Sequence, residues 1–142
     1  MRVLWAMKRV FVPVIWFLLC GCVYGQPAAQ FRIVIHELLA DPSPQIGLPN
    51  SEFIELRNIS AAPVNLRNWK LSDGSSTATI TINYSLQADS CVIICPNGAL
   101  TAYAALGPAI GVANFPSLNN DADVIWLMSS EGRIIHAVAY EQ

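Results

Sequence analysis

The chain has 142 residues, a length that suits one domain, and 54% of them are hydrophobic, which is ample for a buried core. The formal net charge is −2. A nucleic-acid-binding protein needs a clustered basic face, because counterion release drives its affinity. We expect no nucleic-acid partner, because the basic residues beyond position 25 stand singly: Arg32, Arg57, Arg67, Lys70 and Arg133.

The amino terminus has the order of an export signal. Arg2, Lys8 and Arg9 precede an apolar run over residues 10–19, and small residues follow up to Gly25. This order predicts a secretory signal peptide over residues 1–25. The run is shorter than the roughly 20 residues that a membrane-spanning helix needs. We therefore expect a secreted, periplasmic or cell-surface protein whose mature domain spans residues 26–142.

Two processing routes remain open for this signal. Cleavage after Gly25 leaves a chain that begins at Gln26. Alternatively, residues 19–22 resemble a bacterial lipoprotein signal, which would place a lipid on Cys22 and make the membrane a partner. On either route three of the 8 basic residues are lost and all 10 acidic residues stay, so the mature chain carries a net charge of −5.

The remaining residues alternate between short β-rich segments and turn residues. Strands are predicted over residues 32–39, 52–58, 68–72, 79–84, 90–95, 123–128 and 134–140. The last two are expected to form a hairpin, and the alanine-rich residues 99–106 to form a short helix over one end. Strands at this spacing indicate an all-β, antiparallel β-sandwich rather than a parallel sheet.

Alternation along a strand assigns its side chains to two faces. Residues 52–58 direct Ile54, Leu56 and Asn58 toward the core, with Phe53, Glu55 and Arg57 on the outer side. The same reasoning places Ile80, Ile82 and Tyr84 together on one face of the segment 79–84.

The segment 123–128 carries the candidate interaction face. If Ile125 and Leu127 point inward, then Val124, Trp126 and Met128 point outward, and Phe53 lies on the outer side of its own strand. Exposed apolar stripes often mark interfaces, and Trp is enriched among binding hot spots. We expect a protein or glycan partner on the face that carries Phe53, Val124, Trp126 and Met128. A register shifted by one residue would instead bury the same set.

The order of these blocks is similar to the lamin tail domain over about residues 31–140. The most telling block is Glu55-Leu56-Arg57-Asn58, followed by Leu66 and Trp69 three residues apart, and later by Leu118-Asn119-Asn120. His36 and Asp89 stand where that family often has Asn and Gly. The resemblance implies an immunoglobulin-like sandwich of the type found in exported bacterial proteins, with no shared ligand. The structural motif would consist of Glu37, Glu55, Asn58, Trp69, Leu118 and Asn120.

The motif residues have expected structural tasks. Asn58 is expected to bond the backbone of the turn over residues 60–63. Trp69 is expected to fill the space between the sheets, and Leu118 to plug the core. Asn119, Asn120 and Asp121 are expected to satisfy the tight return into the next strand.

No residue set predicts catalysis, a cofactor or a metal. Glu37 and Glu55 are a carboxylate pair without a predicted cleft, and Glu55 is expected to face Arg57 or Lys70. His36 and His136 could meet if the first and last strands adjoin, but two ligands alone make a poor metal site. Residues 119–123 lack the spacing of a calcium loop. No serine lies in a Gly-x-Ser-x-Gly turn.

The sequence therefore favours an exported, non-enzymatic module for binding or adhesion, or one with a purely structural role. The alternative is an accessory module normally attached to an exported enzyme such as a nuclease or another hydrolase. Cys91 and Cys95 are expected to stay unbridged, because four residues of strand span about 13 Å and a disulfide needs Cα atoms within about 7 Å.

Overall fold

The computed structural model describes residues 31–141 of the chain. The predicted signal peptide and Cys22 lie outside the described residues. The strands are β1 (Ile33–Leu39), β2 (Phe53–Asn58), β3 (Val64–Asn65), β4 (Lys70–Ser72), β5 (Thr77–Thr79), β6 (Ser85–Leu86), β7 (Cys91–Pro96), β8 (Ala109–Val112), β9 (Ala122–Met128) and β10 (Ile134–Glu141). A 3-10 turn, η1 (Asn97–Ala99), leads into the short helix α1 (Leu100–Ala104).

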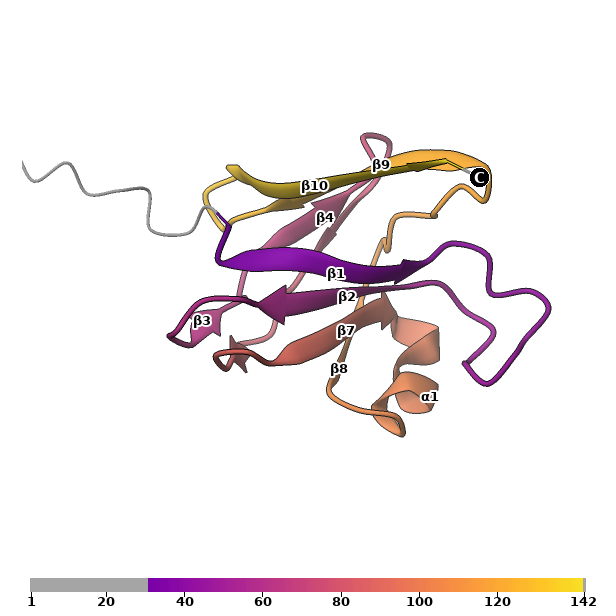
Figure 1. Cartoon of the computed structure of the whole chain (residues 1–142), viewed down its shortest axis with the longest axis horizontal. Helices are drawn as coiled ribbons and strands as arrows, with labels where there is room; N and C mark the ends of the chain where they lie inside the picture. The colour runs from indigo at the N-terminus through magenta and orange to yellow at the C-terminus, as the bar shows by residue number, and fades with distance from the viewer. Residues whose placement is uncertain (1–30, 142) are drawn as a thin grey trace, which may run out of the picture.

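Two four-stranded sheets stack face to face, as Figure 1 shows. The first sheet has the order β1-β2-β7-β8 and the second has the order β10-β9-β4-β5, while β3 and β6 form a small two-stranded ladder. Alternate side chains of both sheets fill the space between them. The principal core residues include Ile35, Leu56 and Ile94 from the first sheet and Leu71, Ile125 and Leu127 from the second. This is the predicted immunoglobulin-like β-sandwich.

The predicted inward face of β2 is confirmed. Ile54, Leu56 and Asn58 are all fully buried between the sheets. The hairpin of β9 and β10 is also confirmed, with Ile125 opposite Val138 and Trp126 opposite Ala137. The predicted helix over residues 99–106 exists, although it is limited to Leu100–Ala104.

The two sheets are joined along one side by their edge strands β1 and β10. The backbone N–H of Ile35 in β1 donates a hydrogen bond of 3.1 Å to Nδ1 of His136 in β10. The histidine ring therefore takes the place of a backbone partner for β1. We call this side of the sandwich the seam.

The sheets are not wholly antiparallel, which corrects one sequence prediction. β7 pairs with β8 in parallel, and the chain crosses between them through η1 and α1. β8 has the composition Ala-Ile-Gly-Val, whose few residues and central glycine give a weak strand signal. β3 and β6 have two residues each, which is too short for alternation to reveal a strand in the sequence.

The predicted strand over residues 79–84 is also wrong. The extended pairing covers Thr77–Thr79 instead, and the chain leaves the sheet after Ile80. Ile80 is buried, whereas Ile82 is 49% exposed, so the two do not share an inward face. The backbone bonds of Ile80 to Asn68 and Trp69 turn the chain toward the β3–β6 ladder.

Helix α1 covers part of the outer surface of the first sheet, beside β7 and β8 (Figure 1). Its Tyr103 packs on Phe53, with ring centroids 5.3 Å apart in an edge-to-face arrangement. Phe53, Cys95 and Tyr103 form a second, smaller apolar cluster. Between residues 31 and 141, no helix has the length and apolar character needed to span a bilayer.

Candidate functional site

The outward side of β9 carries an apolar stripe, as alternation predicted. Ile125 and Leu127 are fully buried in the core, whereas Val124 is 39% exposed. Trp126 and Met128 lie outward on the same face and are partly exposed. The register of β9 is therefore the one in which these three side chains face away from the core.

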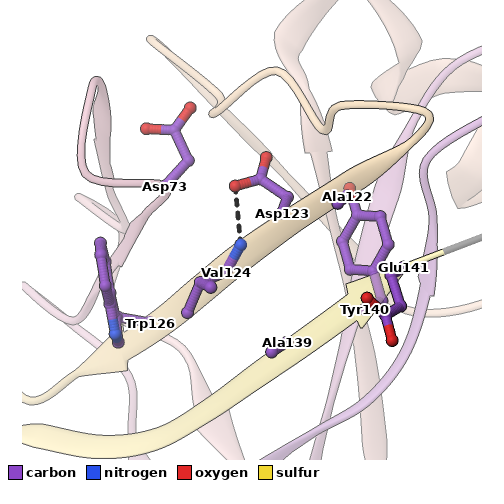
Figure 2. A pocket seen from close by; sticks show the side chains of 8 residues that line it. All are labelled: Asp73, Ala122, Asp123, Val124, Trp126, Ala139, Tyr140 and Glu141. Atoms are coloured by element: carbon purple, nitrogen blue, oxygen red, sulfur yellow. Dashed lines mark hydrogen bonds between the residues drawn. The ribbon is translucent and has the colours of Figure 1, made fainter.

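Small residues on the neighbouring strand leave room beside this stripe. Ala139 lies opposite Val124 and Ala137 lies opposite Trp126, so the outer side of β10 presents two methyl groups there. The result is an open hollow of about 640 Å³ on the second sheet. Its lining residues are Asp73, Ala122, Asp123, Val124, Trp126, Ala139, Tyr140 and Glu141. Figure 2 shows Val124 and Ala139 between Trp126 at one end and Tyr140 with Glu141 at the other.

The position of Trp126 depends on a glycine in the turn between β4 and β5. Gly74 has a φ of +87°, and a Cβ added there would lie 2.9 Å from Cζ3 of Trp126. The indole ring therefore lies directly against the backbone of this turn. Only glycine both adopts this φ without strain and allows such a close approach. The turn holds the ring upright at one wall of the hollow.

The hollow is acidic. Asp73, Asp123 and Glu141 line it, and within the described part of the chain no Lys or Arg does. Oδ1 of Asp73 accepts hydrogen bonds from the backbone N–H groups of Ser76 (2.6 Å) and Ser75 (2.8 Å). Burial works against ionisation here, but hydrogen bonds from Ser76 and Ser75 lower the pKa of Asp73 below its ordinary value. Asp73 is therefore a stable anion at neutral pH.

Asp123 is fixed in a similar way at the other end of the hollow. Its Oδ1 accepts a bond of 2.7 Å from the backbone N–H of Val124, drawn as the dashed line in Figure 2. Its Oδ2 accepts bonds from the backbone N–H (3.2 Å) and side-chain Nδ2 (3.3 Å) of Asn119. Both carboxylates are therefore anchored by their own loops.

Tyr140 lines the other end of the hollow and also packs against the core. Its hydroxyl donates a bond of 2.7 Å to the carbonyl oxygen of Asn119, which ties the end of β10 to the loop before β9. Burial raises the pKa of Tyr140, and the nearby carboxylates of Asp123 and Glu52 raise it further. Burial likewise raises the pKa of Glu52, with the Asp123 carboxylate adding to the rise. The hydroxyl thus stays protonated and donates its bond throughout the physiological range.

Phe53 does not belong to this face, which corrects the predicted interaction set. It lies on the outer side of β2, as alternation requires, but it is only 4% exposed because Tyr103 of α1 covers it. It also belongs to the first sheet, whereas Trp126 belongs to the second. The candidate face therefore contains Val124, Trp126 and Met128 without Phe53.

Most of the predicted motif residues do structural work. Nδ2 of Asn58 donates to the carbonyl oxygens of Ala62 (2.9 Å) and Leu86 (3.0 Å), and its Oδ1 accepts from the N–H of Ser60 (3.0 Å). Trp69 and Leu118 are buried in the core. Asn120 lies exposed in its loop, while neighbouring Asn119 bonds Asp123.

The two motif glutamates lie on the first sheet. Glu37 is exposed and opposite Glu55 in the register of β1 and β2. Glu55 contacts Nδ1 of His36 at 2.8 Å, which corrects the expected pairing with Arg57 or Lys70. Lys70 lies on the second sheet, and Arg57 pairs with Asp89 at 2.6 Å.

Sequence reasoning missed Asp73, Ala139 and Tyr140 as parts of the hollow. Asp73 and Gly74 directly follow the predicted strand over residues 68–72, and no local pattern connects them to Trp126, more than 50 positions later in the chain. The space beside Val124 could have been predicted from the sequence. The hairpin was predicted, and a small residue such as Ala139 opposite a larger one leaves space. That signal depends on a register fixed by the bulge between Ile134 and His136.

The two sheets stack on each other, Asn58 holds a turn in place and Trp69 is buried between the sheets. These features define an immunoglobulin-like β-sandwich module, here with an acidic, aromatic hollow on one outer face. The model of the family described as Lamin Tail Domain matches residues 26–142, and the chain belongs to this family. A comparison with curated proteins found no match. The predicted family is therefore confirmed over the whole described domain.

Proposed function

We propose that this chain is an exported, non-enzymatic binding module whose hollow holds a cationic group of a protein partner. One observation carries the proposal: Trp126 and Tyr140 stand beside three carboxylates in a hollow that no Lys or Arg of residues 31–141 lines. A Lys or Arg side chain gains from both features. Its charge is attracted to the face of an aromatic ring and to the carboxylates around it.

The surroundings of the hollow support a protein partner. Met128 lies on the same outward face, and Ile134, opposite it in the register, is 55% exposed. Together with Val124 and Trp126 they extend the apolar surface along the β9–β10 hairpin. A partner with a basic residue and flanking apolar side chains would fit both the acidic hollow and this apolar surface. An aromatic side chain within an apolar surface, such as Trp126, is typical of binding hot spots.

The carboxylates of the hollow favour binding over catalysis. Oδ1 of Asp73 and both carboxylate oxygens of Asp123 accept hydrogen bonds from nearby backbone N–H groups. A general acid or base needs a carboxyl that is free to exchange a proton with a substrate. Two anchored anions act instead as fixed charges, which suits recognition of a cation.

Titration with an oligo-arginine peptide, followed by NMR, tests this proposal. We expect the indole N–H signal of Trp126 to shift and the binding to weaken as salt is added. Ala139→Phe should fill the hollow and weaken the binding at least tenfold. Ala104→Phe adds the same volume at an exposed position of α1 and should leave the affinity for oligo-arginine unchanged.

Binding that Ala139→Phe leaves unchanged would contradict the proposed location. A neutral oligosaccharide that shifts the Trp126 signal while oligo-arginine does not would replace the cationic protein partner with a glycan.

The export part of the proposal has its own test. The basic, apolar and small segments of residues 1–25 support removal of the amino terminus during secretion. Mass spectrometry of the protein made by its own cells should show a chain that lacks residues 10–19. A mass that includes a lipid on Cys22 would select the lipoprotein route, whereas a chain that retains residues 10–19 would exclude both routes.

A further inference from the structure

Three potential metal ligands meet on the outer face of the first sheet, on the other side of the sandwich from the hollow. They are His36 on β1, Glu55 on β2 and Cys91 on β7, and one ligand atom from each lies within 4.8 Å of the other two. Three neighbouring strands thus contribute one side chain each.

A backbone irregularity brings His36 to this place. The register of β1 and β2 shifts between Ile35, opposite Leu56, and Glu37, opposite Glu55, so His36 is the extra residue of a β-bulge. A bulge re-aims side chains relative to regular alternation. Here it points the ring at Glu55, with Nδ1 2.8 Å from Oε1. On the other side, Cys91 lies opposite Arg57, two residues along β2 from Glu55.

The donor set is the one that zinc prefers. Zinc in proteins takes imidazole nitrogen, thiolate sulfur and carboxylate oxygen at about 2.0–2.3 Å, in a tetrahedral arrangement. Ligand atoms around such an ion lie roughly 3.3–3.6 Å from one another by that geometry. The His36–Glu55 contact of 2.8 Å would open slightly, and the longest separation in the cluster, at most 4.8 Å, would close by small side-chain rotations.

We propose that His36, Glu55 and Cys91 form a binding site for a zinc ion, with water in the fourth position. Cys91 forms no disulfide within residues 31–141, so its sulfur can bind as the thiolate. The site would clamp β1, β2 and β7 together on the outer face of the first sheet. It differs from a pairing of the two histidines, because His136 faces the seam and accepts the bond from Ile35.

The charges around the cluster set the affinity. NH1 of Arg57 lies 3.5 Å from Nε2 of His36, and its NH2 donates to Asp89 at 2.6 Å. A zinc ion on Nδ1 requires the ring proton on Nε2, so the long Arg57–His36 contact must be released. Asp89 offsets the charge of Arg57, and Glu37 is a further exposed carboxylate on β1. Arg57 is therefore the one neighbouring cation that opposes metal binding among these residues.

Titration of the full chain with Zn²⁺ and Co²⁺ tests the proposal. We expect one ion per chain, a thiolate-to-cobalt charge-transfer band, and a higher melting temperature with zinc than with a chelator. His36→Gln, Glu55→Gln and Cys91→Ser should each weaken zinc binding at least about tenfold, the smallest loss typical even of residues that only support a ligand. Cys91→Ser should also abolish the charge-transfer band and the rise in melting temperature.

Matched variants separate this site from general metal binding. Glu37→Gln removes a neighbouring charge but no ligand, so it should weaken zinc binding much less than the three ligand variants do. Cys95→Ala removes the other described thiol and should leave the zinc affinity unchanged. Arg57→Gln should tighten binding, because it removes the opposing charge. No zinc binding by the unaltered chain, or binding that all three ligand variants leave unchanged, overturns the proposal. So does an intermolecular disulfide at Cys91 in a chain that binds no zinc.

Discussion

The outer faces of the two sheets each carry a large aromatic residue, but only one of the two residues is covered by another part of the chain. Phe53 on β2 and Trp126 on β9 are both large aromatic side chains that alternation directs away from the core. Phe53 is 4% exposed because α1 places Tyr103 over it, whereas Trp126 rests against the Asp73–Gly74 turn and remains partly open. Which face a residue takes is a local property, but what covers that face is decided elsewhere in the chain.

The two faces also differ in charge. The uncovered half of the first sheet carries His36, Glu55 and Arg57, which contact one another or Asp89. Among the residues that the structure describes, the hollow on the second sheet is lined by three carboxylates and by no Lys or Arg. One face therefore satisfies its charges internally, and the other presents an unbalanced negative charge beside apolar surface.

Truncation of Phe53 and of Trp126 tests whether the two side chains differ in burial. Phe53→Ala should lower the free energy of unfolding by about 3–5 kcal/mol, since it leaves a cavity under α1. Trp126→Ser should lower it by about 1–2 kcal/mol, because part of the ring is already in solvent. Urea unfolding of both variants gives the values. Equal losses would mean that the face of Trp126 is as well covered as that of Phe53.

Substituting Gly74 tests the support under Trp126. Gly74→Ala forces a left-handed φ on alanine, which costs about 1–2 kcal/mol, and also sets a methyl group against the indole. Gly132→Ala is the matched control, because Gly132 has a φ of +79° and open space around it. Both should lower the free energy of unfolding. Gly74→Ala should lower it further and move the Trp126 NMR signals, and an equal effect of the two variants would argue against the contact.

Thiol labelling compares the covered and uncovered parts of one strand. Burial raises the pKa of Cys95, and burial together with the Glu55 carboxylate raises the pKa of Cys91. A raised pKa leaves less thiolate at a given pH, so both should react more slowly than in the unfolded chain and faster as the pH rises. In the presence of a chelator, Cys91 should react before Cys95, which is fully buried in the cluster under α1. Peptide mapping assigns each rate, and faster labelling of Cys95 would mean that α1 is not held in place.

Much of the fold follows from local patterns. Strong alternation in β2 and β9 identified the inward residues, and the motif around Asn58 and Trp69 identified the family. The strand prediction over residues 79–84 failed beyond Thr79, where the sequence still alternates but residues 80–84 belong to no strand. Ile80 and Ile82 alternate as a strand would, yet backbone bonds take the chain out of the sheet between them.

The sites were harder to predict because they depend on register. A bulge puts His36 over Glu55, and no sequence signal distinguishes a bulged residue from a regular one there. Likewise, the hollow exists because Ala139, rather than a larger residue, stands opposite Val124. Cysteine spacing did predict that Cys91 and Cys95 stay unbridged, and both are free thiols.

The seam has a consequence for the behaviour of the protein at high concentration. An edge strand with free N–H and C=O groups can recruit the edge of a second molecule and start fibrillar aggregation. At Ile35 this template is interrupted, because the N–H that an incoming strand would need is already bound to the ring of His136. Since the ring comes from β10, the β1 edge of the first sheet lies against the β10 edge of the second sheet. A histidine side chain thus makes the β1 edge a poorer template for a strand of a second molecule, while β8 and β5 form the opposite edges of the two sheets.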